Sequence, residues 1–152
     1  MKMVWTTEEL LAQWTATPEE SAMVGKKPKK KRLGMLAQLL FYKKNVCFGN
    51  SRNDFAPAVL EHLAEQLGVS LDTLEHFEWA ERSGRRHRET IVAFVGFRPF
   101  DTIAEKTFRK WLTHEVWPKE LNEDACDELI TGWFLREKYD RPAPSTFTVS
   151  PA

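Results

Sequence analysis

The sequence predicts an all-α protein, a multi-helix bundle of two helix-turn-helix-like subdomains. Helix-start signals recur along the chain, apolar residues repeat three and four positions apart, and no segment shows the strict alternation of a half-buried strand. The chain has 152 residues, of which 42% are apolar and 29% charged. A soluble chain of this length and composition can bury a sizeable hydrophobic core.

Two capping boxes near the N-terminus predict the first two helices. Thr6 is the expected N-cap of the first helix, and Glu9 is placed to accept a hydrogen bond from the N–H of Thr6. Thr17 and Glu20 repeat this arrangement at the second helix. Pro18 then stands at the first helical position, where its missing N–H costs nothing.

A basic run follows the second helix. Residues 26–32 hold six cations and Pro28, and both self-repulsion and the proline predict a mobile loop. Apolar residues at helical spacing from Leu33 onward predict a helix after this loop. The basic side chains are candidate phosphate contacts. Each lysine that binds a phosphate of a nucleic-acid backbone releases a counterion from the nucleic acid, which favours binding. The candidates are Lys26, Lys27, Lys29, Lys30, Lys31 and Arg32.

The pattern over residues 57–79 is typical of a helix-turn-helix. A helix over residues 57–67 is expected to end at Gly68, which permits a left-handed turn, and a second helix is expected over residues 71–79. That second helix contains three carboxylates and no Lys or Arg, which makes it a poor partner for phosphates. We therefore expect it to brace another helix rather than to read bases.

A break over residues 81–84 is the expected boundary between two subdomains, residues 1–82 and residues 83–152. Further helices are expected over residues 85–95, 102–116 and 123–139, and prolines make the last stretch extended. A second basic cluster surrounds the start of the helix over residues 85–95, where backbone N–H groups already favour anions. Its members are candidate groove contacts, with the histidine in support: Arg82, Arg85, Arg86, His87 and Arg88.

The charge of the chain is unevenly distributed although the net charge is zero. Residues 1–49 hold nine Lys or Arg and four Asp or Glu, whereas residues 50–100 hold six and eight, and residues 101–152 hold seven and ten. A basic N-terminal third indicates an anionic partner at that end.

Several classes of function have no support in the sequence. Cys47 and Cys126 form neither a disulfide framework nor, with the four histidines, a zinc-ligand spacing, so no metal is expected. No glycine-rich phosphate loop or nucleophile motif is present, and neither a cofactor nor a catalytic residue is expected. Because no apolar run approaches the roughly 20 residues of a membrane span, and no secretion signal is visible, we expect a cytoplasmic protein without membrane contact.

Six segments follow one another along the chain: residues 14–15 (WT), 18–20 (PEE), 32–39 (RLGMLAQL), 64–69 (AEQLGV), 86–91 (RHRETI) and 96–100 (GFRPF). In this order they resemble the N-terminal region of the transposases of replicative, cointegrate-forming bacterial transposons, the Tn-three family. The resemblance covers most of residues 5–100.

The resemblance implies a function. In that family the N-terminal region is a helical, bipartite unit that binds the terminal inverted repeats of the transposon, and an acidic triad far downstream carries out strand transfer. The chain is then expected to bind double-stranded DNA without catalysing, and to self-associate through the rest of a longer transposase. The dense basic run and the acidic segment over residues 71–79 depart from the pattern expected of the family.

Two other classes of function remain open from the sequence. A helical protein-interaction or assembly module would show an exposed apolar patch with basic residues scattered over the surface, whereas a single basic face favours DNA binding. A small hydrolase or nuclease would need carboxylates clustered in a pocket and metal-dependent activity, and no spacing of acidic residues indicates one.

Overall fold

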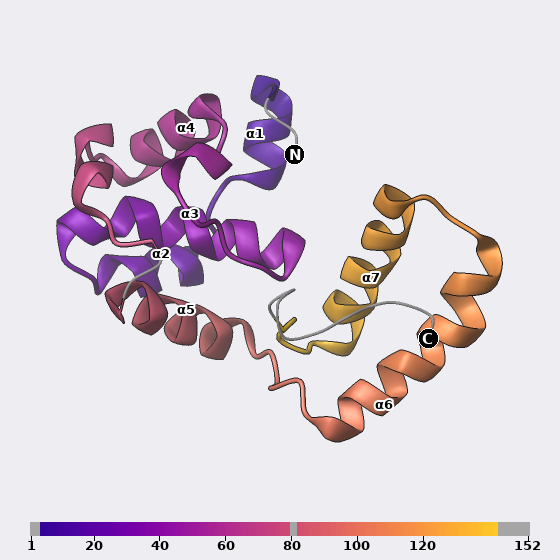
Figure 1. Ribbon diagram of the computed structural model, residues 1–152. Helices are drawn as coiled ribbons and strands as arrows, with labels where there is room; N and C mark the ends of the chain where they lie inside the picture. Colours follow the sequence, from indigo (N-terminus) through magenta and orange to yellow (C-terminus); the bar gives the residue numbers. More distant parts are fainter. Residues whose placement is uncertain (1–3, 80–81, 143–152) are drawn as a thin grey trace. The chain divides into compact units, whose positions relative to one another are not determined.

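The computed structural model describes residues 4–79 and 82–142, and it confirms the all-α class. Within these ranges the extended segments form only one isolated bridge, between Arg98 and Tyr139. No helix in the described part is long and apolar enough to cross a membrane. Figure 1 shows the α-helices, which are α1 (Thr7–Gln13), α2 (Pro18–Gly25), α3 (Lys29–Asn45), α4 (Pro57–Leu67), α5 (Arg82–Val95), α6 (Thr102–Trp111) and α7 (Glu123–Glu137).

Contacts divide the chain into two compact units. The first unit holds the residues up to Ile91, except residues 45–47. Those three residues group with the second unit, which otherwise begins at Val92. The division therefore falls inside α5, later than the expected boundary between residues 82 and 83. It does so because the first turns of α5 pack on the first unit while its end leads into the second.

The first unit is built around α3, which runs through its middle (Figure 1). All ten residues over 33–42 are buried, so α3 is covered on every side rather than along one stripe. A helix surrounded in this way is a central core element, and its neighbours pack against it from several directions. The apolar spacing after Leu33 predicted the helix but not its complete burial.

Both predicted capping boxes are confirmed. Thr6 and Glu9 exchange side-chain and backbone hydrogen bonds at the start of α1, and Thr17 and Glu20 do so at the start of α2. Glu20 is buried, and its second carboxylate oxygen lies 2.7 Å from Nζ of Lys43 on α3. The cap therefore also fixes α2 against the central helix.

Two glutamine side chains attach irregular segments to helices. Each side-chain amide donates one hydrogen bond to the backbone of the segment and accepts one from it, as a neighbouring β-strand would. Gln38 on α3 donates from Nε2 to the carbonyl of Gly49 and accepts from the N–H of Gly49, both at 2.8 Å. Gln66 on α4 donates to the carbonyl of Trp14 at 2.7 Å and accepts from the N–H of Ala16 at 2.9 Å. Such pairs satisfy backbone groups that have no helical partner.

The corner after α4 differs from the predicted helix-turn-helix. Gly68 ends α4 with a φ of 65°, as expected for a left-handed turn. The helix expected over residues 71–79 is instead a short 3-10 helix, η2 (Leu71–His76). The hydroxyl of Thr73 donates to the carbonyl of Ser70, which favours the tighter turn, and Phe77 then leaves the helix to pack on α3.

Aromatic rings join α6 to α7 in the second unit. The ring of Phe108 on α6 lies 4.9 Å from that of Trp133 and 5.0 Å from that of Phe134, both on α7. Between the two helices, α6 continues into a π-helical turn, η3 (Leu112–Val116), and a 3-10 turn, η4 (Trp117–Lys119). At the other end of this hairpin, the backbone N–H of Arg98 donates to the carbonyl of Lys138, and the backbone N–H of Asp140 donates to the carbonyl of Arg98, each at 2.7 Å.

We predict that Gln38→Ala lowers the free energy of unfolding by about 2–4 kcal/mol, because the substitution leaves a cavity and two buried backbone groups of Gly49 without partners. Gln66→Ala is the matched control, since Gln66 makes the same kind of pair at an exposed position, and its cost should be closer to about 1 kcal/mol. Urea unfolding of both variants measures the difference. Equal costs would contradict the role of burial.

Candidate nucleic-acid interface

The corner between α2 and α3 carries the first basic cluster. The expected loop over residues 26–32 is shorter than predicted, because α3 begins at Lys29 and only residues 26–28 connect the two helices. The burial of residues 33–42 stabilises α3 enough for its helix to extend back through the charged residues as far as Pro28. The basic run is thus mostly the first turn of a helix.

The six cations of this corner do not share one role. Lys26, Lys29 and Lys30 are exposed, whereas Lys27 and Lys31 are half-buried. Arg32 instead donates from its guanidinium to the carbonyls of Lys27 at 2.9 Å and Gly25 at 3.0 Å. Arg32 therefore caps the end of α2, and the exposed lysines are the side chains available to a ligand.

The start of α3 is electrostatically unusual. The N-terminus of a helix has a partial positive charge that acidic residues normally complement, as they do in the first turns of α1, α2 and α7. The first turn of α3 has no acidic residue and carries a run of cations. Lysines at this position repel the helix dipole and one another, so a bound anion would lower the free energy of this turn.

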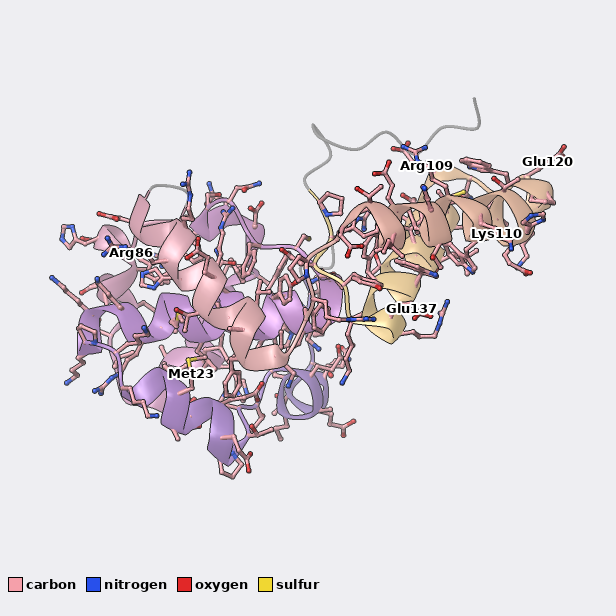
Figure 2. The ribbon with its side chains drawn as sticks, turned by 90° about the horizontal axis from the view of Figure 1, so that it is seen from below. Met23, Arg86, Arg109, Lys110, Glu120 and Glu137 are labelled. Carbon is pink, nitrogen blue, oxygen red and sulfur yellow. The ribbon has the colours of Figure 1, made fainter. Side chains whose placement is uncertain are left out.

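The second basic cluster lies on the first turns of α5, whose opening turn also has no acidic residue. Arg85 and Arg86 are exposed, and Figure 2 shows Arg86 on the surface of the first unit. His87 is buried with 7% of its surface exposed, and Arg88 is half-buried. The side chain of Arg82 lies outside the described part of the structure.

A stack of rings brings the two clusters together. A Cβ on Gly34 of α3 would lie 2.4 Å from the ring of Phe77, so only a glycine lets this ring rest on the helix. On its other side, Phe77 stacks on the imidazole of His87, with 5.2 Å between ring centres and 16° between planes. Because His87 belongs to α5, this stack sets the start of α5 near the start of α3.

The electrostatics of His87 support this juxtaposition. Burial lowers the pKa of His87 below its usual value, the positive charges of Lys31 and Lys27 lower it further, and Glu78 opposes them. Lysines from the α2–α3 corner are thus close enough to act on a residue of α5. The basic residues of the two segments, far apart in the sequence, form one cationic corner of the first unit.

Arg88 anchors α5 instead of facing outward. Its guanidinium donates to the carbonyl of Trp79 at 3.0 Å and lies 5.4 Å from the centre of the Phe48 ring. Gly84 comes so close to the same backbone that a Cβ there would lie 2.8 Å from the carbonyl oxygen of Trp79. His87 and Arg88 therefore hold α5 in place, and Arg85 and Arg86 are left for contact.

The sequence prediction missed the two residues that position this corner, Gly34 and Phe77. A usable signal was present, because a glycine inside an otherwise apolar helical run indicates that another group approaches the backbone closely. What the sequence did not provide was the identity of that group, which comes from a segment more than 40 residues away.

Within residues 4–79 and 82–142, no set of three or more His, Cys, Asp or Glu side chains is arranged to hold a metal ion.

The fold and this corner define an all-helical, two-unit protein with a cationic surface on its first unit. Residues 1–149 match the family described as Domain of unknown function (DUF4158), and the chain belongs to that family. No curated protein and no solved structure matches the chain.

We predict that Gly34→Ala destabilises the first unit by about 1–3 kcal/mol, because the new methyl group overlaps the ring of Phe77. Gly25→Ala is the matched control, since nothing lies within 4 Å of a Cβ at this exposed end of α2. The control should be neutral or slightly stabilising, because alanine is the better helix former. Thermal or urea unfolding measures both, and equal behaviour would rule out the close approach of Phe77.

We predict that His87 makes stability depend on pH. Its lowered pKa means that the unfolded chain binds a proton more readily than the folded chain, so the stabilisation is complete above the unfolded value near 6.5 and is lost as the pH falls through the folded value. His87→Phe keeps a ring against Phe77 and should flatten this dependence. His114→Gln, at an exposed position, should leave it unchanged. Urea unfolding across this pH range distinguishes the two, and a dependence that persists in His87→Phe would contradict the assignment.

Proposed function

We propose that this chain is the DNA-binding N-terminal part of a transposase, which recognises transposon terminal inverted repeats and contains none of the strand-transfer residues. The observation that carries the proposal is the cationic corner, where Phe77 links α3 to α5 and the charges of Lys27 and Lys31 reach His87. Two helix N-termini and exposed cations from separate segments are a suitable surface for a polyanion. The resemblance of the sequence to Tn-three family transposases indicates that this polyanion is the DNA of the transposon ends.

The exposed cations of this corner are available for phosphates. In the described part of the structure, none of the ion pairs involves Lys26, Lys29, Lys30, Arg85 or Arg86. Lysines act as point charges and suit the sequence-independent contacts that set the register of a protein on DNA. Arginines carry a forked set of donors that fits phosphate or the edge of guanine, so Arg85 and Arg86 are the candidates for sequence reading.

Three residues that the sequence grouped with these contacts have a supporting role in the proposal. Arg32 caps α2, and His87 and Arg88 hold α5. Their loss would move the contact residues rather than remove a contact. The proposal further implies a cytoplasmic location, double-stranded DNA as the partner, and self-association through the rest of a longer transposase.

The protein-interaction alternative has less support. The large apolar side chains that are exposed in the described part stand on different elements, such as Leu11 on α1, Phe94 on α5, Ile103 on α6 and Leu121 after η4. Scattered in this way, they do not form the contiguous apolar patch of a protein-docking site. The basic residues of α5 and of the α2–α3 connection, by contrast, form one cationic corner of the first unit, which favours a polyanion such as DNA.

We predict that the chain binds a duplex carrying a candidate transposon end more tightly than a scrambled duplex, and that the preference survives moderate salt. Arg85→Ala/Arg86→Ala should weaken binding to the end more than binding to the scrambled duplex, by about 1–3 kcal/mol for each bidentate base contact. Fluorescence anisotropy across a salt series measures both affinities.

The matched control removes two exposed arginines outside the corner, Arg52→Ala/Arg136→Ala, and should change either affinity little. If the Arg85→Ala/Arg86→Ala variant loses both affinities equally, these residues contact only phosphate. If the unmodified chain binds neither duplex at low salt, the DNA-binding proposal is wrong and the protein-interaction module takes its place.

A further inference from the structure

The outer face of α6 in the second unit combines cations with an exposed apolar side chain. Ile103, Lys106 and Lys110 follow one another at intervals of three and four residues, so they lie along one side of the helix. All three are exposed, and 74% of the surface of Ile103 is accessible. A branched apolar residue so exposed, one turn before the first of two lysines, contributes nothing to the core of the unit.

The threonines of this face add apolar surface rather than free hydroxyls. The hydroxyl of Thr107 donates to the carbonyl of Ile103 at 3.2 Å, and that of Thr113 donates to the carbonyl of Arg109 at 2.9 Å. With each hydroxyl bonded to the preceding turn, the methyl groups are left as the contact surface. The outer face therefore offers methyl groups flanked by ammonium groups.

Carboxylates are absent from this face and abundant elsewhere in the second unit. Every residue of α6 that is exposed is neutral or basic, and the one acidic residue of the helix, Glu105, is half-buried and paired with Arg109 at 3.0 Å. Figure 2 shows Arg109 and Lys110 on the surface of α6. In contrast, the exposed side chains at the start of α7 are acidic, and on α5 the exposed Glu89 lies one turn after Arg85 and Arg86.

The opposite face of α6 is held rigidly. Ala104, Phe108 and Leu112 are buried, and the ring of Phe108 packs between those of Trp133 and Phe134. A helix fixed along one side by a close-packed aromatic core presents its other side with little loss of conformational freedom on binding.

We infer that the outer face of α6 enters the major groove of duplex DNA. Lys106 and Lys110 bind phosphate or guanine edges, and Ile103 with the threonine methyl groups contacts thymine methyls. The charge of the face selects a polyanion, and its methyl groups match the apolar feature that the major groove presents. This inference rests on the proposed function, and it adds α6 to the cationic corner as a second, separate contact.

The test compares two double variants of the full chain with equal loss of charge. Lys106→Gln/Lys110→Gln removes the lysines of the face, and Lys119→Gln/Lys138→Gln removes two exposed lysines of the second unit outside it. The probes are a duplex that the unmodified chain enriches from a randomised pool and a shuffled duplex of the same composition. Urea unfolding checks that each variant keeps the stability of the unmodified chain.

The face variant should bind both duplexes about tenfold more weakly than the control, with a salt dependence shallower by about two phosphate contacts. Ile103→Ala should reduce the preference for the enriched duplex and leave the salt dependence unchanged, because a methyl contact releases no counterion. If the face variant binds as tightly as the control, and Ile103→Ala keeps the full preference, the inference about α6 is wrong.

Failure of this inference can be separated from failure of the proposed function. Loss of binding in the Arg85→Ala/Arg86→Ala variant, together with unchanged binding in the α6 variants, overturns only the contact by α6. Absence of binding by the unmodified chain to any member of the pool overturns both.

Discussion

The ring of Phe77, held between Gly34 and His87, is the contact on which the arrangement of the first unit depends. The ring can lie against α3 only because residue 34 has no side chain, and it then offers its other face to the imidazole of α5. The contacts of Arg88 and Gly84 with Trp79 hold α5 to the same segment, and the stack is the contact that links this segment to α3. The cationic corner is thus a product of core packing, since a buried aromatic contact sets the spacing of charges at the surface.

Core residues and contact residues alternate closely along α5. Within four consecutive positions, Arg85 and Arg86 are exposed, His87 is buried against Phe77, and Arg88 turns to the carbonyl of Trp79. Helical geometry produces this alternation, because successive side chains point about 100° apart. A cluster that looks uniform in the sequence therefore divides into an exposed pair and an anchoring pair, and only the exposed pair is accessible to a ligand.

Local signals in the sequence predicted much of this fold, and distant contacts account for what they did not predict. The boxes at Thr6 and Thr17 and the turn at Gly68 were correct, because each depends on residues within one helical turn. The loop expected over residues 26–32 was too long, since the buried part of α3 stabilises helix through Lys29 against the repulsion of its charges. Likewise, the sequence grouped Arg88 with the candidate DNA contacts. Its structural partners, Phe48 and Trp79, lie outside α5, so no helical spacing could indicate them.

Two features of the chain are unfavourable for local stability or solubility. One is positive charge at a helix start, and the other is an exposed apolar side chain. The first turn of α3 places lysines where a helix favours carboxylates, and α6 exposes Ile103 one turn before Lys106, at a position where a polar residue would favour solubility. Departures of this kind are expected at functional positions, where a ligand supplies the missing interaction. A polyanion would relieve the first by neutralising the lysines at the helix start, and DNA in particular would relieve the second, because its major groove presents methyl groups beside phosphates. A partner protein with an acidic surface would satisfy the lysines of α3, and an apolar contact on such a partner would also cover the isoleucine of α6. What favours a polyanion, as proposed, is that exposed cations accompany both departures, although each unit carries its own.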